Sequence, residues 1–221
     1  MERMKTEPVT PFTTRLRDRA WLSEKAFQVA LDRPSGFRFL PGQSIRIANG
    51  SAERDYSLAC APDSELLTLC VRHVLHGILS TFLAEAPLGT SLTFTGPHGY
   101  FLFQESAQPP VFVATGAGVA PFCSMSGAGV NGFTLLHGVR TVNELYYERH
   151  LRAASALYVP CLSEGTTPGC FTGRVSDWAR EHLPPLTYDF YLCGSREMIR
   201  DVTRLADERF PGSLVHTEIF H

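Results

Sequence analysis

The chain has 221 residues, of which 44% are hydrophobic and 19% are charged, and its formal net charge is -2. This balance is typical of a globular protein with a sizeable core, arranged as one large domain or two small ones. A net charge so close to zero gives no indication of nucleic-acid binding. Residues 1–10 lack the apolar core of a signal peptide, and no apolar run is as long as a membrane span. We therefore expect a soluble, cytoplasmic protein with no nucleic-acid partner.

Six cysteines are scattered along the chain, and no two of them form a CxxC pair. Zinc and iron–sulfur sites usually need such pairs, so the spacing gives little support to a metal centre. Most of the cysteines lie in or beside apolar runs, which predicts buried free thiols in a reducing compartment. They are Cys60, Cys70, Cys123, Cys161, Cys170 and Cys193.

The first half of the chain, up to residue 104, has mostly the alternating pattern of β-strands. Alternating or apolar segments at 26–31, 43–48, 66–72 and 91–96 are separated by turn signals such as Pro41-Gly42. Short strands at this spacing predict a closed or sandwiched β domain. One helix is expected at 80–85, with Ser80 as its N-cap and Pro87 just beyond its end.

The polar segment 104–110 ends in two prolines, which is typical of a linker and predicts domains at 1–104 and 105–221. After it, strands and helices alternate, which predicts a five-stranded parallel sheet covered on both faces. The expected strands lie near 111–115, 133–138, 156–161, 188–193 and 214–219, and the helices near 121–129, 143–153, 174–182 and 195–209.

A glycine turn follows the first of these parallel strands and opens a helix. Gly116 permits a tight turn, Gly118 lets the backbone approach a phosphate, and Pro121 suits the first turn of the helix. The positive end of the helix then favours an anion. We predict a nucleotide site here, although such turns also serve plain packing.

The end of the next strand bears on the choice of nucleotide. It offers Arg140 and no acidic residue, and an arginine there suits the 2′-phosphate of NADP. The alternative is a surface arginine at a strand end. Cys193 ends the fourth parallel strand, where it can pack beside the nicotinamide or simply fill a tight turn.

The first half carries a second candidate phosphate site. Arg54 can pair with a phosphate, Tyr56 can present its ring to a flat cofactor, and Ser57 can hydrogen-bond a ring edge. The turn 77–80 then supplies free backbone N–H groups at a helix start. The segment 71–74 ends a strand close to this turn.

Together these segments resemble the ferredoxin–NADP reductase superfamily, in order and spacing, from Phe37 to the C-terminus. The resemblance rests on Arg54-Asp55-Tyr56-Ser57, Gly77-x-x-Ser80, the segment Thr115–Pro121 and four further segments. These are Pro41-Gly42-Gln43, Gly96-Pro97-His98-Gly99, His137-Gly138-Val139-Arg140 and Leu192-Cys193-Gly194.

The resemblance implies a six-stranded antiparallel β-barrel that carries FAD, followed by an α/β domain that binds NADP or NAD. It implies FAD contacts from Arg54, Tyr56, Ser57, Arg72, His73, Val74, Gly77, Leu79, Ser80 and Thr81. It implies nicotinamide-nucleotide contacts from Thr115, Gly116, Gly118, Arg140 and Cys193. Ser57, Cys193 and Glu218 become candidate catalytic residues, with Glu218 as a proton relay. Phe220 or His221 would cover the flavin, unless the last strand simply frays at its end.

One departure keeps the choice between NADP and NAD open. Members that use NADP often carry a Ser-Arg pair after the third parallel strand, whereas this chain has Ser163 followed by Glu164. Arg174, ten residues later, is the nearest arginine downstream.

The implied activity is hydride transfer between nicotinamide C4 and flavin N5, followed by exchange of single electrons with a carrier protein. We expect an acidic carrier such as ferredoxin, flavodoxin or an oxygenase component, docked at Arg15, Arg17, Arg19 and Arg54. A monomer is expected. Two alternatives remain open: a free-flavin reductase, and an electron-transfer or regulatory flavoprotein subunit of a larger complex.

Overall fold

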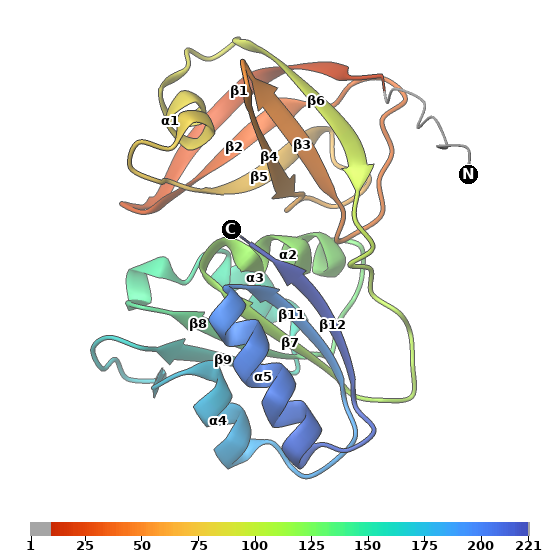
Figure 1. Ribbon diagram of the computed structural model, residues 1–221, viewed down its shortest axis with the longest axis vertical. Helices are drawn as coiled ribbons and strands as arrows, with labels where there is room; N and C mark the ends of the chain where they lie inside the picture. Colours follow the sequence, from red (N-terminus) through yellow and green to blue (C-terminus); the bar gives the residue numbers. More distant parts are fainter. Residues whose placement is uncertain (1–9, 221) are drawn as a thin grey trace, which may run out of the picture.

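The computed structural model describes residues 10–220. Residues 1–9 and His221 lie outside the described residues. The expectation that residues 1–10 are not a signal peptide therefore falls almost wholly on residues that are not described. Figure 1 shows two domains stacked along the long axis, and we call them the β domain and the α/β domain. Among the described residues, no helix has the length and apolar character needed to cross a membrane.

The β domain is a six-stranded antiparallel sheet in the order β4-β3-β6-β1-β2-β5, which confirms the strand number and direction expected. In the described residues its edge strands meet at a bridge between Leu58 and Leu69, rather than along a continuous ladder. The elements are β1 (Phe12–Ser23), β2 (Ala26–Asp32), β3 (Ser44–Asn49), β4 (Ala52–Ser57), β5 (Leu66–Arg72), α1 (Ile78–Glu85) and β6 (Ser91–His98).

Strand β1 was not recognised from its sequence pattern. Only Thr14 and Leu16 are buried along its twelve residues, and basic side chains stand between and after them. Its first residues pair with β6, and the stretch from Leu16 onward pairs with β2. The strand thus gets its stability from two partners rather than from its own apolar face.

The α/β domain contains a parallel sheet in the order β10-β9-β8-β7-β11-β12. The elements are β7 (Pro110–Thr115), the 3₁₀ turn η1 (Gly116–Val119), α2 (Ala120–Gly127), β8 (Thr134–Val139), the 3₁₀ turn η2 (Val142–Glu144), α3 (Glu148–Ala154), β9 (Leu157–Leu162), β10 (Phe171–Thr172), α4 (Val175–His182), β11 (Asp189–Gly194), α5 (Arg196–Arg209) and β12 (Leu214–Ile219).

The prediction of five parallel strands was short by one. The extra strand, β10, has only two residues, and these pair with Cys161 and Leu162 at the end of β9. So short a strand leaves no alternation to read in the sequence. The five strands expected are all present.

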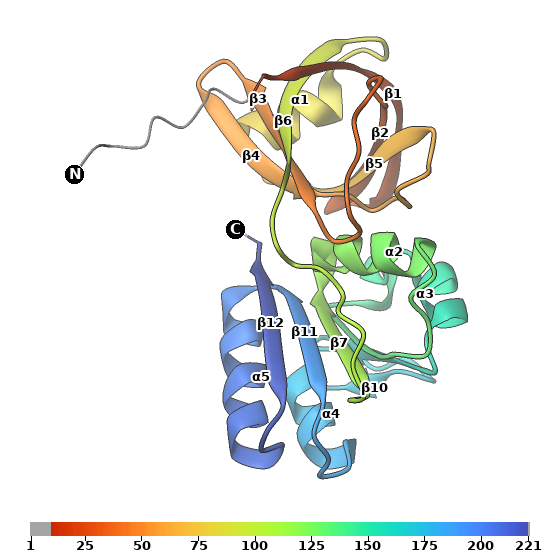
Figure 2. The same cartoon turned by 90° about the vertical axis from the view of Figure 1, so that its right-hand side faces the viewer.

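Two helices cover each face of the parallel sheet, α2 and α3 on one side and α4 and α5 on the other (Figure 2). Helix α5 buries Met198, Ile199, Val202, Leu205 and Ala206, which recur at the spacing of one helix face. Helix α2 differs, because every residue from Ala120 to Ser126 is buried. A helix that is buried all round must be enclosed, and α2 lies between the sheet and the β domain (Figures 1 and 2).

The two domains share an apolar cluster, and the segment that connects them is held in place by hydrogen bonds. Ala26 and Cys70 of the β domain pack in the same apolar cluster as Phe122 and Met125 of α2. In the connecting segment, the Gln104 N–H donates to the Tyr191 hydroxyl at 3.0 Å, and Ser106 donates to the Asp189 carboxylate. These hydrogen bonds therefore hold the connecting segment against β11.

All six cysteines are free. Five are buried, and Cys170, in the loop between β9 and β10, is partly exposed. Burial raises the pKa of the Cys70 and Cys161 thiols to about 12. These thiols stay protonated and pack as small apolar groups.

Candidate functional site

A cleft of about 2470 Å³ lies between the two domains. Its walls come from β4, the turn before α1, the η1 turn and the carboxyl ends of the parallel strands. Pockets for one small ligand usually measure roughly 300–1,000 Å³. The cleft is therefore large enough for two dinucleotides, one against each domain.

The cleft brings together most of the predicted site residues from both halves of the chain. Those that line it are Arg54, Tyr56, Ser57, Arg72, Val74, Gly77, Leu79, Ser80, Thr115, Gly116, Gly118, Arg140, Glu218 and Phe220. The side chains of His73, Thr81 and Cys193 do not line it.

The His73 ring faces away from the cleft and packs on aromatic neighbours. Its centroid lies 5.3 Å from that of Trp21, with the rings at 89°, and 6.2 Å from that of Phe27. Thr81 lies one turn inside α1, where its N–H bonds the Gly77 carbonyl at 2.9 Å. Neither position suggests direct contact with a ligand in the cleft.

The turn before α1 has the features of an anion site in the β domain. Gly77 is the N-cap, and in the described residues no side chain caps this end and no acid stands in its first turn. A Cβ on Gly77 would lie 2.7 Å from Ser80 Oγ, so the turn needs glycine. The uncapped N–H groups and the positive helix end favour a pyrophosphate here.

Ser80 has a different local role from the one expected. The helix begins at Ile78, two residues earlier than predicted, so Ser80 lies in the first turn and is not the N-cap. Its hydroxyl accepts from the Val74 N–H at 3.2 Å and lies 3.2 Å from the Val74 carbonyl. Ser80 therefore holds the shape of the turn.

Strand β4 places cationic and aromatic side chains beside this turn. Arg54 is exposed and donates to the carbonyl of Glu53 at 2.7 Å, which leaves other guanidinium N–H groups directed to the cleft. Arg72, at the end of β5, is also exposed. Tyr56 is partly buried, and burial raises its pKa to about 12, so its ring stays neutral.

Ser57 and Glu218 meet across the cleft, one from each domain. The Ser57 hydroxyl donates to Glu218 Oε1 at 2.9 Å. Glu218 Oε2 is buried and has no hydrogen-bond partner among residues 10–220. Burial, and to a smaller extent the nearby Asp55, raises the pKa of Glu218 to about 7, against the lowering effect of Ser57. A carboxyl group with such a pKa can hold or release a proton near neutrality.

Cys193 pairs in register with Glu218, so the two side chains lie on the same side of the sheet. The thiol is fully buried, and burial followed by the neighbouring Glu218 raises its pKa well above the ordinary value. It stays protonated, which is the wrong state for a nucleophile. Its predicted packing role remains compatible with this position.

The glycine turn of the α/β domain is tied to the end of β11. Gly116 has a φ of +54°, as a tight turn requires. A Cβ on Gly118 would lie 2.3 Å from the Cys193 carbonyl oxygen, so the close packing of this turn on β11 requires glycine here. The Ser195 N–H donates to Thr115 Oγ1 at 2.9 Å, which joins the two loops.

The helix after this turn begins within one residue of the predicted start, and Pro121 lies in its first turn as expected. The η1 turn intervenes, and α2 opens at Ala120 with Pro121 as its second residue. In the described residues no side chain caps this end either. Because the first residues of α2 are buried and outside the cleft lining, the backbone N–H groups that the α/β domain can offer to an anion are those of the η1 turn, where Gly116 and Gly118 line the cleft.

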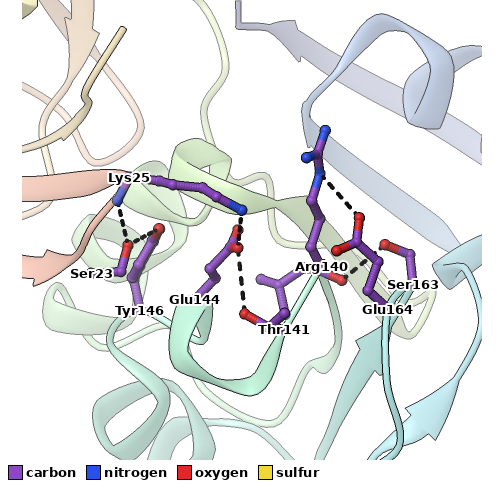
Figure 3. A network of polar contacts seen from close by, with 9 residues as sticks. Ser23, Lys25, Arg140, Thr141, Glu144, Tyr146, Ser163 and Glu164 are labelled. Atoms are coloured by element: carbon purple, nitrogen blue, oxygen red, sulfur yellow. Dashed lines mark hydrogen bonds and ion pairs between the residues drawn. The ribbon is translucent and has the colours of Figure 1, made fainter. Parts of the chain in front are cut away.

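Arg140 is not alone at the end of β8. Its Nε lies 3.8 Å from Glu164 Oε1, and the Glu164 N–H donates to the Arg140 carbonyl at 2.9 Å (Figure 3). Both side chains are exposed. The charge at this end of the cleft is therefore balanced and not simply positive.

Two of the predicted docking arginines, Arg17 and Arg19, make contacts within the β domain. Arg17 pairs with Asp32 at 2.5 Å. Arg19 donates to the carbonyls of Ala84 and Ala86 at the end of α1. Arg54 lines the cleft. Two of the four arginines thus serve the fold of the β domain.

The cleft residues that were missed in the sequence include Lys25, Glu144 and Tyr146. No motif marks them, because they lie about 120 residues apart in the chain and meet only in the folded protein. Tyr100 was also missed and is 96% exposed at the cleft. Its position inside Gly99-Tyr100-Phe101, next to a segment already recognised, was the available signal.

The fold and the cleft define a two-domain oxidoreductase that binds two dinucleotides. Residues 15–103 match the family Oxidoreductase FAD-binding domain, and residues 112–204 match the family Oxidoreductase NAD-binding domain. The uncapped helix starts and the Gly77 turn fit these ligands.

Curated relatives agree with this class. The chain is 30% identical to ferredoxin–NADP reductase B of Sorangium cellulosum over 94% of its own length and 97% of that protein. It is 39% identical over 111 residues to the 2-halobenzoate 1,2-dioxygenase electron transfer component of Burkholderia cepacia, covering 49% of this chain and 33% of that one. It also matches the anthranilate 1,2-dioxygenase electron transfer component of Acinetobacter baylyi, at 30% identity over 77% of this chain and 54% of that protein.

Solved structures show the same fold. A ferredoxin NADP⁺ reductase from Neisseria gonorrhoeae aligns with a TM-score of 0.83 at 22% identity, over 95% of this chain and 98% of that one. The cytochrome P450 reductase GcoB from Amycolatopsis aligns with a TM-score of 0.84 at 25% identity, over 97% of this chain and 71% of that one. The chain belongs to the ferredoxin–NADP reductase superfamily, with FAD and a nicotinamide dinucleotide as its cofactors.

Proposed function

We propose that this protein takes a hydride from a reduced nicotinamide dinucleotide onto FAD and passes electrons singly to a carrier protein. The observation that carries the proposal is the cleft, which is lined by the uncapped start of α1, by the Thr115–Gly118 turn and by the hydrogen-bonded pair Ser57 and Glu218. The relatives named as electron transfer components support the second part of the activity.

The chain's own residues supply binding, orientation and proton handling. We assign the FAD phosphates to Arg54, Arg72 and the N–H groups that follow Gly77, and a flat ring to the face of Tyr56. Bound FAD accepts two electrons together and releases them one at a time. Glu218 holds a proton at its carboxyl group and exchanges it through the Ser57 hydroxyl.

Three more assignments complete the site. Phe220, partly buried at the cleft, covers the flavin on the side of the α/β domain. The main chain of Thr115, Gly116 and the rest of the η1 turn that lines the cleft binds the nicotinamide dinucleotide phosphates. Cys193 packs beneath Glu218 and supports its position.

The neighbourhood of Arg140 favours NADH over NADPH in this proposal. Glu164 lies against Arg140, so a 2′-phosphate there would meet a carboxylate as well as a guanidinium. An acidic side chain near the ribose is the usual way to accept a hydrogen bond from the 2′-hydroxyl of NAD. Anaerobic titration of the purified protein with each nucleotide decides between them.

The same titration tests the whole proposal. Protein that is purified yellow should be bleached by about one equivalent of NADH, and more slowly by NADPH. A colourless protein that FAD cannot reconstitute would contradict the assignment and favour a free-flavin reductase. Diaphorase activity of the isolated chain with an artificial acceptor would argue against a subunit that works only in a larger complex.

We further infer that the electron acceptor is a carrier protein. We also infer that the reductase is a monomer and is located in the cytoplasm. The support for a carrier protein is the electron transfer function of the relatives, of which the two dioxygenase components are longer, since the chain spans 33% and 54% of their lengths. An acidic carrier has less support than the sequence suggested, because Arg17 and Arg19 are bound within the β domain. Comparing carrier reduction at low and high salt measures this directly.

A further inference from the structure

Two side-chain contacts join the domains at one end of the cleft. Lys25 Nζ lies 2.7 Å from Glu144 Oε1, and Ser23 Oγ lies 2.8 Å from the Tyr146 hydroxyl (Figure 3). Ser23 ends β1 and Lys25 precedes β2, whereas Glu144 ends η2 and Tyr146 follows it. A turn of the β domain thus contacts one segment of the α/β domain twice.

These contacts are better protected than ordinary surface pairs. The Glu144 side chain is 13% exposed and Tyr146 is 5% exposed, whereas the Lys25 side chain is 52% exposed, so the protection comes from the α/β domain side of the contacts. Exposed ion pairs contribute little because water competes for both charges, but partly buried pairs are screened less. Loss of the Lys25 ammonium group would leave the largely buried Glu144 carboxylate without its cation.

The next residue, Tyr147, is held in an uncommon backbone conformation. Its φ is +58°, in the left-handed region that bulky residues rarely adopt. Its ring packs in the apolar cluster that includes Ala26 of the β domain, and its hydroxyl lies beside the Cys70 thiol. Such strain persists only where the surroundings fix the residue, so the segment is anchored in the domain boundary.

The same segment continues directly from the nucleotide site. Arg140 and Thr141 follow β8, and Thr141 Oγ1 lies 3.5 Å from Glu144 Oε1. Lys25, Glu144 and Tyr146 all line the cleft. The contacts therefore stand between the parts of the cleft assigned to the two cofactors.

We propose that Ser23, Lys25, Glu144, Tyr146 and Tyr147 form an interdomain clasp, and that Lys25 and Glu144 are positioning residues for hydride transfer. This inference rests on the proposed function. Hydride transfer needs the donor carbon of the nicotinamide and the acceptor nitrogen of the flavin to lie about 3–3.5 Å apart. A misplacement of about 1 Å can slow such a reaction about 100-fold. Each centre would be carried by a different domain, so the clasp fixes their separation.

The test uses Lys25→Met, Glu144→Gln and the charge-swapped double variant Lys25→Glu/Glu144→Lys, all as holoprotein. Flavin reduction at saturating NADH should slow about tenfold in each single variant, with KM changed less than twofold. The swapped pair should recover at least half of the lost rate. Glu148→Gln is the matched control, because it removes an ion pair of 2.6 Å within α3 that does not cross between domains.

Hydrogen exchange provides a readout that does not depend on activity. Backbone amides of residues 142–147 and of the 23–25 turn should exchange about tenfold faster in each single variant and not in Glu148→Gln. Unchanged exchange and unchanged flavin reduction in the single variants would overturn the clasp, as would equal effects in the control. If the wild-type holoprotein is not reduced by either nucleotide, the proposed function fails, and exchange alone still decides whether the clasp exists.

Discussion

At the scale of single residues, Glu218 determines how the proposed electron path responds to pH. Its pKa of about 7 follows from burial, while the carboxyl group still reaches Ser57. Because the pKa is raised, Glu218 carries its proton below pH 7 and loses it above. A protonated carboxyl group can donate, so transfer should slow as the pH rises through about 7.

We predict that the pH profile of flavin reduction by NADH has an inflection near pH 7 that is absent in Glu218→Gln. The measurement is single-turnover reduction between pH 5.5 and 9. Ser57→Ala should move the inflection upward, because the Ser57 hydrogen bond lowers the pKa of Glu218. An inflection that persists unchanged in Glu218→Gln would assign it to another group.

His137 sets a second pH dependence, this time of stability. The ring is fully buried in β8, with Nδ1 2.8 Å from the Tyr158 hydroxyl and Nε2 unpartnered within residues 10–220. Burial lowers the pKa of His137 to about 3, compared with an ordinary value of 6.5. Between these values the unfolded chain binds the proton and the folded chain does not, so stability falls as the pH drops below 6.5.

We therefore expect His137→Gln, which keeps a polar side chain that does not titrate, to lose less thermal stability than the wild type between pH 7 and pH 5. Thermal midpoints across this range give the comparison. His182→Gln is the control, because His182 is an exposed residue stacked on Trp178. Equal slopes for the wild type and His137→Gln would show that His137 does not contribute.

At the scale of elements, the contact between the η1 turn and the end of β11 makes Gly118 indispensable. A Cβ there would lie 2.3 Å from a backbone oxygen, so the two loops must separate. We predict that Gly118→Ala costs roughly 1–3 kcal/mol of stability and weakens nicotinamide nucleotide binding about tenfold. Chemical denaturation and nucleotide titration measure the two effects.

Gly129 provides the comparison for this prediction. It has a φ of +100°, and a Cβ there meets no atom of the described chain within 4 Å. Gly129→Ala should thus lose stability through backbone strain alone and keep its nucleotide affinity. Equal loss of affinity in both variants would mean that the η1 turn is not the nucleotide site.

How far the sequence predicted the elements depended on how each one is stabilised. The apolar run of β7 and the amphipathic pattern of α5 were readable because each buries its own side chains. Strand β1 was missed because few of its side chains are apolar and point inward, so its sequence lacks a clear alternation. Its pairing with β2 and β6 stabilises it instead. The start of α1 was misplaced because Ser80 bonds backward to Val74 instead of capping the helix.

At the scale of the whole molecule, the shared apolar cluster couples the two domains. Ala26 and Cys70 pack with residues of α2, so neither domain keeps its full core without the other. We predict a single cooperative thermal transition for the protein, since interfaces of this apolar kind resist independent motion. Calorimetry with two separated transitions would contradict this coupling.

The part of the site in each domain could be predicted from the sequence, but the contacts between the two parts could not. The two phosphate turns could be recognised separately, because each follows a strand and begins a helix. That Ser57 meets Glu218, and that Lys25 meets Glu144, depends on how the domains pack. No local pattern carries that information, since these partners lie more than 100 residues apart in the chain.

The distribution of the cysteines has a practical consequence for chemical labelling. Five of the six thiols are shielded from solvent, and Cys170 alone among them all is partly exposed. A maleimide dye applied to the native protein should therefore attach at one position without any engineering. Because Cys170 lies in the loop between β9 and β10, with Glu148 and Arg152 of α3 as charged neighbours, the dye would mark that side of the α/β domain.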